Sequence, residues 1–497
     1  MSSDSGQKPQ YVEVDKNDIP GRLDRLPWSG FHLTVIVALG VAWILDGLEF
    51  TLVGSLAALL ERRATLHLSA PDIGVAASAY LVGAVLGSLL FGYLADRYGR
   101  KRLFTTTLLL YMGATAATGL SWSLMSFAVF RFLTGAGIGG EYSAINSAIQ
   151  ELIPARRRGR IDLLVNGSFW IGSAAASTLS LVILHSGVIA PALGWRLAFG
   201  LGAILGLMAL RLRRFIPESP RWLMSRGRVR EAHTIVASIE RRAGVAPPAD
   251  DGSAAKARQA YPVRFLTAPR VILGRYRKRA ILAATLMVTQ LFFYDAFFFT
   301  YALVLVRFYH ARATDVGAYL LPFALSNFLG AALLGRFFDT IGRRPMITGT
   351  YALSGILMVI AAWLFRGSLL GGAGQTGAWA AAFFFASAGA SAAYLTVSES
   401  FPLEIRASAI ALFFAFGTAV GGVVAPSLLG VLIASGSRDR VFWGYVLGAV
   451  LMLLGALAEW RYGLATEGRS LESIAGSLSD EGSPPGRGPR PPGDRRP

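Results

Sequence analysis

Runs of about 20 apolar residues, separated by short polar segments, recur along the whole chain. A helix of that length crosses the hydrocarbon core of a bilayer, and in lipid each such segment must satisfy its own backbone polar groups. The pattern therefore predicts an all-α membrane protein with twelve transmembrane helices. The expected spans are 31–60, 73–95, 103–120, 124–150, 161–185, 195–212, 280–306, 316–338, 345–365, 378–398, 407–434 and 441–460.

A long polar segment near the middle of the chain separates the first six spans from the last six. It contains an amphipathic pattern that predicts a helix near 227–243. The tail is rich in Pro, Gly and charge, which favours disorder. The expected parts are a disordered cytoplasmic N-terminus (1–27), an N-terminal six-helix bundle (28–214), a cytoplasmic central loop (215–279), a C-terminal six-helix bundle (280–464) and a cytoplasmic, mostly disordered tail (465–497).

The Arg and Lys residues gather in loops that follow even-numbered spans. Examples are DRYGRKR at 96–102, ARRRGR at 155–160 and the central segment 213–279. Loops of this composition stay in the cytoplasm. We therefore expect a multi-pass protein of the cell membrane with both termini in the cytoplasm.

The composition agrees with a membrane protein, since 53% of residues are hydrophobic and only 16% are charged. The net charge of +18 is explained by the basic loops, and no basic, aromatic-rich soluble domain indicates nucleic-acid binding. The absence of cysteine excludes disulfides and thiolate nucleophiles. With no metal-ligand cluster, no nucleophile–base set and no phosphate loop, we expect neither an enzyme nor a metal or cofactor.

The string Gly135–Gly140 formally matches the dinucleotide-binding pattern G-x-G-x-x-G. No strand is expected before it, and it lies within a helical apolar run. Small residues at helical spacing allow two helices to approach closely in lipid. We therefore interpret these glycines as a helix-packing surface.

The two halves of the chain repeat each other. GYLADRYGRK at 92–101 corresponds to GRFFDTIGRR at 335–344, and ELIPARRRGR at 151–160 corresponds to ESFPLEIRAS at 399–408. The two offsets are nearly equal, which indicates a duplicated six-helix unit. In transporters built from repeats, the binding site lies between the repeats near the middle of the membrane.

These motifs resemble the major facilitator superfamily, whose signature loop G-x-x-x-D-R-x-G-R-R/K appears here at 92–101 and again at 335–344, with Thr340 in place of the Arg. The chain is most similar to the sugar-porter branch and its organic-acid relatives. The supporting strings are PESPRWL at 217–223, GWR at 194–196, ELIPARRRGR, and ATEGRSLESI at 465–474, an altered copy of PETKGRSLEEI that lacks its Pro-Glu. The resemblance covers residues 31–474 and implies two pseudo-symmetric six-helix bundles, the major facilitator fold.

The resemblance also implies ion-pair networks between the halves on the cytoplasmic side, which break and re-form as the halves rock. The alternative is that these charges only orient the protein and face water. The residues carried over from the family motifs are Gly92, Asp96, Arg97, Gly99, Arg100, Glu151, Arg158, Arg160, Glu218, Arg221, Asp339, Arg343, Arg344, Glu399 and Arg406.

Two carboxylates interrupt the first span in AWILDGLEFTL. Asp46 and Glu49 are three residues apart, so they share a helix face, and a charge at this depth needs a partner. Arg131 in the fourth span is the expected partner of Asp46, as in sugar porters. Protonation of an acid that gains and loses an arginine partner couples transport to a proton gradient. The alternatives are direct substrate contact and a static buried pair, and Glu49 shares the proton, contacts substrate or faces water.

The residues expected to bind substrate are Asn166, Trp170, Gln290, Tyr294, Asp295, Asn327, Tyr394 and Glu141. Most of the sugar-binding set of sugar porters is missing, which does not favour a hexose. In an unbroken helix Gln290 and Asp295 point about 140° apart. Aromatic residues crowd the seventh and eleventh spans, which suggests a substrate with an apolar or aromatic face.

The sequence thus favours a secondary active transporter, a proton symporter for a small organic solute. Its expected partners are the solute, the proton and the lipid bilayer, with no nucleic acid, and it is expected to act as a monomer. One alternative is an exporter that exchanges protons for amphipathic compounds. Another is a non-transporting sensor on the same scaffold.

Overall fold

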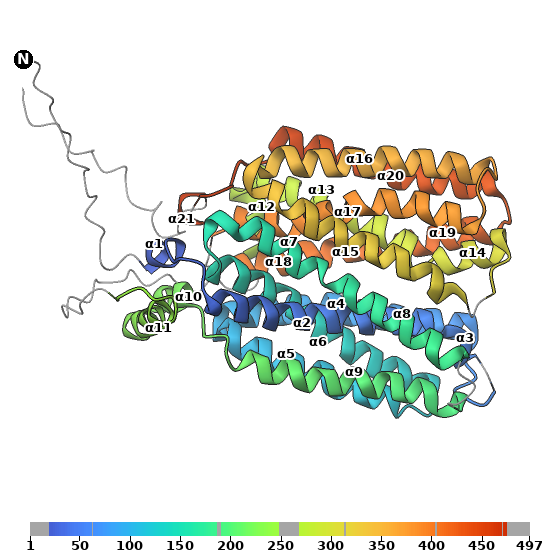
Figure 1. Cartoon of the computed structure of the whole chain (residues 1–497), viewed down its shortest axis with the longest axis horizontal. Helices are drawn as coiled ribbons and strands as arrows, with labels where there is room; N and C mark the ends of the chain where they lie inside the picture. Colours follow the sequence, from blue (N-terminus) through green and yellow to red (C-terminus); the bar gives the residue numbers. More distant parts are fainter. Residues whose placement is uncertain are drawn as a thin grey trace, which may run out of the picture.

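A computed structural model describes residues 19–61, 63–185, 190–247, 268–312, 315–402, 405–469 and 471–474. Within these residues the regular structure is helical and no strand is found. Figure 1 shows two groups of long helices lying side by side, with α2 to α9 (blue to green) in one group and α13 to α20 (yellow to red) in the other. Each group corresponds to one copy of the sequence repeat.

The first group carries spans one to six. Its helices are α2 (Gly30–Ser55), α3 (Ala57–Leu60), α4 (Ala70–Tyr98), α5 (Arg100–Gly119), α6 (Leu124–Leu152), α7 (Arg158–Gly167), α8 (Phe169–His185) and α9 (Pro191–Arg213). The fifth span consists of α7 and α8, which meet at a break around Ser168. The Ser168 hydroxyl donates to the Val165 and Gly40 carbonyl groups, which satisfies part of the interrupted backbone.

The second group carries spans seven to twelve. Its helices are α12 (Ala268–Arg275), α13 (Arg277–Phe298), α14 (Tyr301–Tyr309), α15 (Val316–Thr340), α16 (Arg343–Arg366), α17 (Gly372–Ser400), α18 (Arg406–Gly417), the π-helix η4 (Thr418–Gly422), α19 (Val424–Ala434) and α20 (Arg438–Tyr462). The seventh span is α13 with α14, and the eleventh is α18, η4 and α19. The twelve-helix fold expected from the sequence is confirmed.

Nine of the described helical segments are long and apolar enough to cross a membrane. The remaining spans are α5, α6 and the pair α7–α8. Polar residues lower the hydropathy of α5, which begins with Arg100-Lys101-Arg102, and of α6, which contains Arg131 and Glu141, whereas the break in the fifth span leaves α8 only 17 residues long. These spans bury part of their polar residues against other helices, which removes them from lipid.

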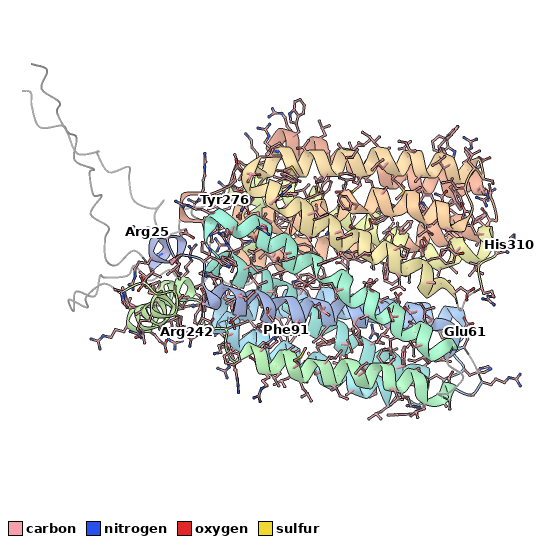
Figure 2. All side chains as sticks on the ribbon, in the orientation of Figure 1. Arg25, Glu61, Phe91, Arg242, Tyr276 and His310 are labelled. Carbon is pink, nitrogen blue, oxygen red and sulfur yellow. The ribbon has the colours of Figure 1, made fainter. Side chains whose placement is uncertain are left out.

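The two ends of the helix bundle differ in what covers them. Figure 2 places Arg25, Arg242 and Tyr276 at one end and Glu61 and His310 at the other. The first end also carries both copies of the repeated motifs, and we call it the motif end. It is covered by α1 (Ile19–Asp24), α10 (Pro220–Ser225), α11 (Val229–Arg242) and α21 (Leu471–Ile474) (Figure 1).

The expectation of disorder over residues 1–27 is wrong for its last part. Ile19 and Leu23 of α1 are buried, and Arg22 forms an ion pair with Glu240 of α11 at 2.6 Å. The order therefore comes from a partner far along the chain, which local composition does not reveal. Residues 1–18, 248–267 and 475–497 lie outside the described residues, so the disorder expected for the N-terminal segment and the tail is not tested there.

The glycine-rich string of α6 packs against α4, as expected from the sequence. A Cβ atom at Gly135 or Gly139 would overlap the backbone of Tyr80 or Ala84, and one at Gly83 of α4 would overlap Phe132. Backbone atoms cannot yield as a flexible side chain can. The two helices can approach this closely only because neither has a side chain at these positions.

We expect Gly139→Ala to lower the melting temperature of the purified protein by several degrees, because forcing α4 and α6 apart costs about 1–3 kcal/mol. The matched control is Gly113→Ala on α5, where an added Cβ would meet nothing within 4 Å. Thermal unfolding in detergent checks both variants. Equal melting temperatures for the two variants would contradict the close-packing interpretation.

Candidate functional site

A cavity lies between the two halves, with an empty volume of about 890 Å³ that includes the space at its mouth. Both groups of helices contribute to its wall. Half of the twenty lining residues are aromatic: Trp43, Phe50, Tyr80, Tyr142, Phe169, Trp170, Tyr294, Phe298, Tyr394 and Phe414. The polar lining residues are Asn166, Gln290, Asp295, Ser387, Ser391 and Thr418. A cavity of this kind suits a small, largely apolar ligand that a few polar groups orient.

Aromatic rings from the two halves meet across the cavity. Tyr142 of α6 stacks on Phe414 of α18 with ring centroids 4.6 Å apart, and Trp170 of α8 lies 5.6 Å from Tyr294 of α13. Through these contacts, rings from both halves form part of the same cavity wall. Movement of one half against the other would therefore reshape the cavity.

Six of the eight residues expected to bind substrate line this cavity: Asn166, Trp170, Gln290, Tyr294, Asp295 and Tyr394. Asn327 and Glu141 are not among the described residues that line it. Asn327 is fully buried on α15 and accepts a hydrogen bond from the Tyr294 hydroxyl at 2.8 Å. It therefore fixes the position of the Tyr294 ring, which lines the cavity. Glu141 points into the first bundle, where it forms an ion pair with Arg213.

Gln290 and Asp295 both line the cavity although they lie on one unbroken helix. The lining residues of α13 occur at positions 290, 291, 294, 295 and 298, which together span an arc of about 140°. Gln290 and Asp295 stand at the two edges of that arc. The wide angle between them is therefore compatible with one binding site.

The expected pairing of Asp46 with Arg131 is wrong. Arg131 instead donates to Glu49 at 2.5 Å, and both side chains are buried. Glu49 lies six residues before the end of α2, and Arg131 lies seven residues after the start of α6, which runs the opposite way. At about 1.5 Å per residue these two groups share one depth, whereas Asp46 lies roughly 4.5 Å further toward the motif end.

Asp46 belongs to a second buried group of charges. Its side chain is 1% exposed, and neither carboxylate oxygen has a hydrogen-bond partner among the described residues. The charged residues that interact with it are Glu141, Arg213 and Glu49. Arg213 is the last residue of α9, and its guanidinium lies over the Phe104 ring, 3.1 Å from the centroid. The sequence reasoning missed Arg213 because it resembles a loop charge at the end of a span.

At the motif end, the first copy of the repeated motif contacts the second half. Asp96 accepts hydrogen bonds from the Ser408 backbone N–H at 2.9 Å and from its hydroxyl at 2.7 Å, in the first turn of α18. Arg100 bridges Asp96 and Glu151, at 3.2 Å from each. Arg406 of α18 lies 3.9 Å from Glu151. The network therefore ties α4 and α6 to α18.

The second copy of the motif forms an equivalent network, in which the roles of the two halves are exchanged. Asp339 accepts hydrogen bonds from the backbone N–H groups of Gly159 and Arg160, at 3.0 and 2.8 Å, in the first turn of α7. Arg343 bridges Asp339 at 3.1 Å and Glu399 at 2.7 Å. Arg158 of α7 completes the network 3.7 Å from Glu399. Each carboxylate cap faces the positive end of a helix in the opposite half, where an anion is stabilised.

The glycine of each loop has a backbone conformation that other residues rarely adopt, with φ of 103° at Gly99 and 118° at Gly342. A carboxylate then caps the helix that follows. Glu218 accepts from the Arg100 N–H at 3.0 Å and the Lys101 N–H at 3.3 Å. Burial raises the pKa of the Glu218 carboxyl, and these hydrogen bonds oppose the shift.

Glu467 has the corresponding place in the second half, accepting from the Arg343 N–H at 3.3 Å. It lies in the altered string ATEGRSL, which lacks the Pro-Glu of its family pattern. The adjacent Thr466 hydroxyl donates to Glu399 at 2.6 Å. The sequence reasoning missed both residues because the glutamate occurs at a shifted position.

The remaining motif residues are less central. Arg221 of α10 pairs with Asp24 at 3.2 Å, Arg344 donates to the Trp460 carbonyl, and Gly92 is buried in α4. Arg97 is exposed and lies over the Tyr98 ring. The structure therefore places Arg97 and Arg344 outside the networks that join the halves.

One buried carboxylate links the cavity to the motif end and was not anticipated. Asp162 of α7 is fully buried and accepts from Gln150 at 3.3 Å and from Asn166 at 3.1 Å. Asn166 lies one turn away and lines the cavity. The spacing of Asp162 and Asn166, four residues apart in the fifth span, is the signal that was available in the sequence.

A twelve-helix fold with a cavity between two repeated halves, joined at one end by two equivalent ion-pair networks, is typical of membrane transporters of the major facilitator class. The chain belongs to the family described as sugar (and other) transporters, whose model matches residues 33–477. It is an integral, multi-pass membrane protein, and its relatives are transporters rather than enzymes.

Among similar proteins, the niacin transporter NiaP of Acinetobacter baylyi is 29% identical over 468 residues, covering 92% of this chain and 99% of that one. The cis,cis-muconate transport protein of the same species is 25% identical over 456 residues, covering 89% and 96%. The structure of the proton:xylose symporter XylE bound to 6-bromo-6-deoxy-D-glucose matches with a TM-score of 0.74 and 20% identity, covering 89% of this chain and 98% of that one.

Proposed function

We propose that this protein is a proton-coupled symporter that moves a small organic solute across the cell membrane by alternating access. The observation that carries the proposal is the charge balance of the buried cluster in the first bundle. Asp46, Glu49 and Glu141 supply three carboxyl groups, whereas Arg131 and Arg213 supply two guanidinium groups. One carboxyl group therefore lacks a counter-ion, and a proton neutralises it.

Asp46 is the group that takes this proton, because the other two acids each have an arginine. A buried carboxylate without a partner is costly in a low-dielectric interior and is neutralised instead. Asp46 and Glu49 lie in α2, the helix that also presents Trp43 and Phe50 to the cavity. Loading of the cavity and protonation of Asp46 can therefore act on the same helix.

Alternating access follows from the mirrored networks. They join the halves at the motif end, and their short ion pairs can break as the halves rock. The basic loops favour a cytoplasmic motif end, which supports the proposal that the arrangement described is closed on the cytoplasmic side. Because the cavity and both networks are complete within one chain, we propose that the protein works as a monomer.

We infer that the solute is a small, planar organic compound rather than a hexose. The wall is dominated by aromatic side chains, with few amides to bind sugar hydroxyl groups. Relatives of this chain are named as transporters of niacin and of cis,cis-muconate, whereas the fold neighbour is named for xylose. The lining residues favour a planar, partly apolar substrate.

The test is uptake into proteoliposomes of a panel of small planar organic compounds, with xylose for comparison, at equal pH and with the outside more acidic. We expect at least one planar compound to accumulate only when the proton gradient is inward, and xylose not to accumulate. A protonophore should abolish the accumulation. Flux that does not depend on the proton gradient would indicate a uniporter. Accumulation driven only by an outward proton gradient would indicate the exporter. The absence of any flux would favour the non-transporting sensor.

A further inference from the structure

Asp295 is a buried acid in the wall of the cavity, and the coupling cluster does not include it. Its side chain is only 7% exposed, and no described residue forms a hydrogen bond or ion pair with it. It lies against Gly422 of the π-helix η4, where an added Cβ would press on its Oδ2 atom. Such local widenings of a helix frequently occur at functional sites.

The surroundings of Asp295 give its carboxylate no counter-charge. Among the described residues that line the cavity, it is the one with a carboxylic acid or a basic side chain, and Arg131 and Arg213 are paired with Glu49 and Glu141. An ionisable side chain in a membrane interior marks a functional site, and its partner has to be identified. The described protein residues do not supply one, and Asp295, unlike Asp46, lines the cavity, where a bound cation can reach it.

The rings around Asp295 suit a positively charged molecule. The neighbouring Tyr294 lies 5.6 Å from Trp170, and Trp170 lies 6.1 Å from Phe298. The faces of aromatic rings attract cations, most strongly where water is displaced, and cages of such rings recognise organic ammonium groups. A flat cation in the cavity could contact these rings from the open side and also neutralise the carboxylate, because all four residues line the same space.

We propose that Asp295 determines substrate specificity and that the substrate is a small planar aromatic or N-heterocyclic compound with a positive charge. The inference rests on the proposed function, because it takes the cavity as the substrate site. Gly422 is the positioning residue in this arrangement, since its missing side chain leaves room for the carboxylate beside the cavity.

The test measures binding of three probes of nearly equal shape to the purified full-length protein by calorimetry. Benzamidinium is cationic, benzamide is neutral and benzoate is anionic. We expect benzamidinium to bind about tenfold or more tightly than benzamide, and benzoate most weakly. Asp295→Asn should remove that advantage and leave benzamide affinity within about twofold to threefold, which also shows that the variant is folded.

Two further variants sharpen the test. Gly422→Ala should weaken benzamidinium through displacement of the carboxylate, although it changes no charge, whereas Asp439→Asn, at an exposed ion pair, should change nothing. Tightest binding of benzoate, survival of the cation preference in Asp295→Asn, or no binding of any probe would overturn the inference. Proton-driven uptake of an anionic planar compound would overturn this inference but would leave the proposed function intact. A preference for the cationic probe together with uptake that does not depend on the proton gradient would support this inference but overturn the proposed function.

Discussion

Asp46→Asn is expected to abolish proton-driven accumulation of the solute while solute exchange across the membrane continues. An amide cannot carry the proton, yet it keeps the shape of the side chain and adds no uncompensated charge next to Glu141 and Arg213. A gradient of one pH unit is worth about 1.4 kcal/mol for one proton, so it supports an accumulation of about tenfold. In the variant, the solute concentration inside should only equal the concentration outside, an accumulation ratio of about one. Uptake and counterflow in the same proteoliposomes measure the two activities.

The matched control is Asp439→Asn, which makes the same change at an exposed ion pair with Arg366 and should accumulate solute as the wild type does. Accumulation that persists in Asp46→Asn would refute the assignment of the coupling proton. Glu49→Gln is a less clean test of coupling. It leaves Arg131 buried without its partner, and breaking a buried ion pair on one side costs about 3–5 kcal/mol of stability.

The long-range plan of this molecule was predictable from sequence because lipid imposes it. Apolar runs of sufficient length must become helices in a membrane, and the repeated motifs indicate two related bundles. The breaks within the fifth, seventh and eleventh spans were not predicted, since hydropathy averages over a window and does not detect a local change of hydrogen bonding. The order of α1 was also missed, because it depends on Glu240, far away in sequence.

The candidate site was predictable only in part, for a similar reason. Helical spacing placed Asp46 and Glu49 on one face, but the choice of partner depends on depth and on the direction of the neighbouring helix. Arg131 therefore pairs with Glu49. Arg213 and Asp162 stand near the ends of predicted spans, where charges usually face water. Only the packing of α9 and α7 against other helices shows that they are buried.

The mirrored networks make a second prediction with a large expected effect. Arg343 holds Asp339 and Glu399 together, and through them it joins the second half to α7. The chain contains no cysteine, so a single introduced thiol reports accessibility without background. Ser391→Cys places that thiol in the cavity wall, and Arg242→Cys, on exposed α11, identifies which vesicle face is the motif end (Figure 2).

In the Ser391→Cys background, Arg343→Ala is expected to increase labelling by an impermeant maleimide from the motif end by about tenfold or more. A loss of about 1.4 kcal/mol from the closed arrangement changes its population relative to the open one tenfold, and a buried ion pair is worth more than that when one partner is removed. Arg343→Lys should give an intermediate rate, because it keeps the charge but not the forked contact with Glu399. Arg312→Ala, at an exposed ion pair with Asp315, is the control and should leave the rate unchanged. Equal labelling in all variants would show that the networks do not hold this end closed.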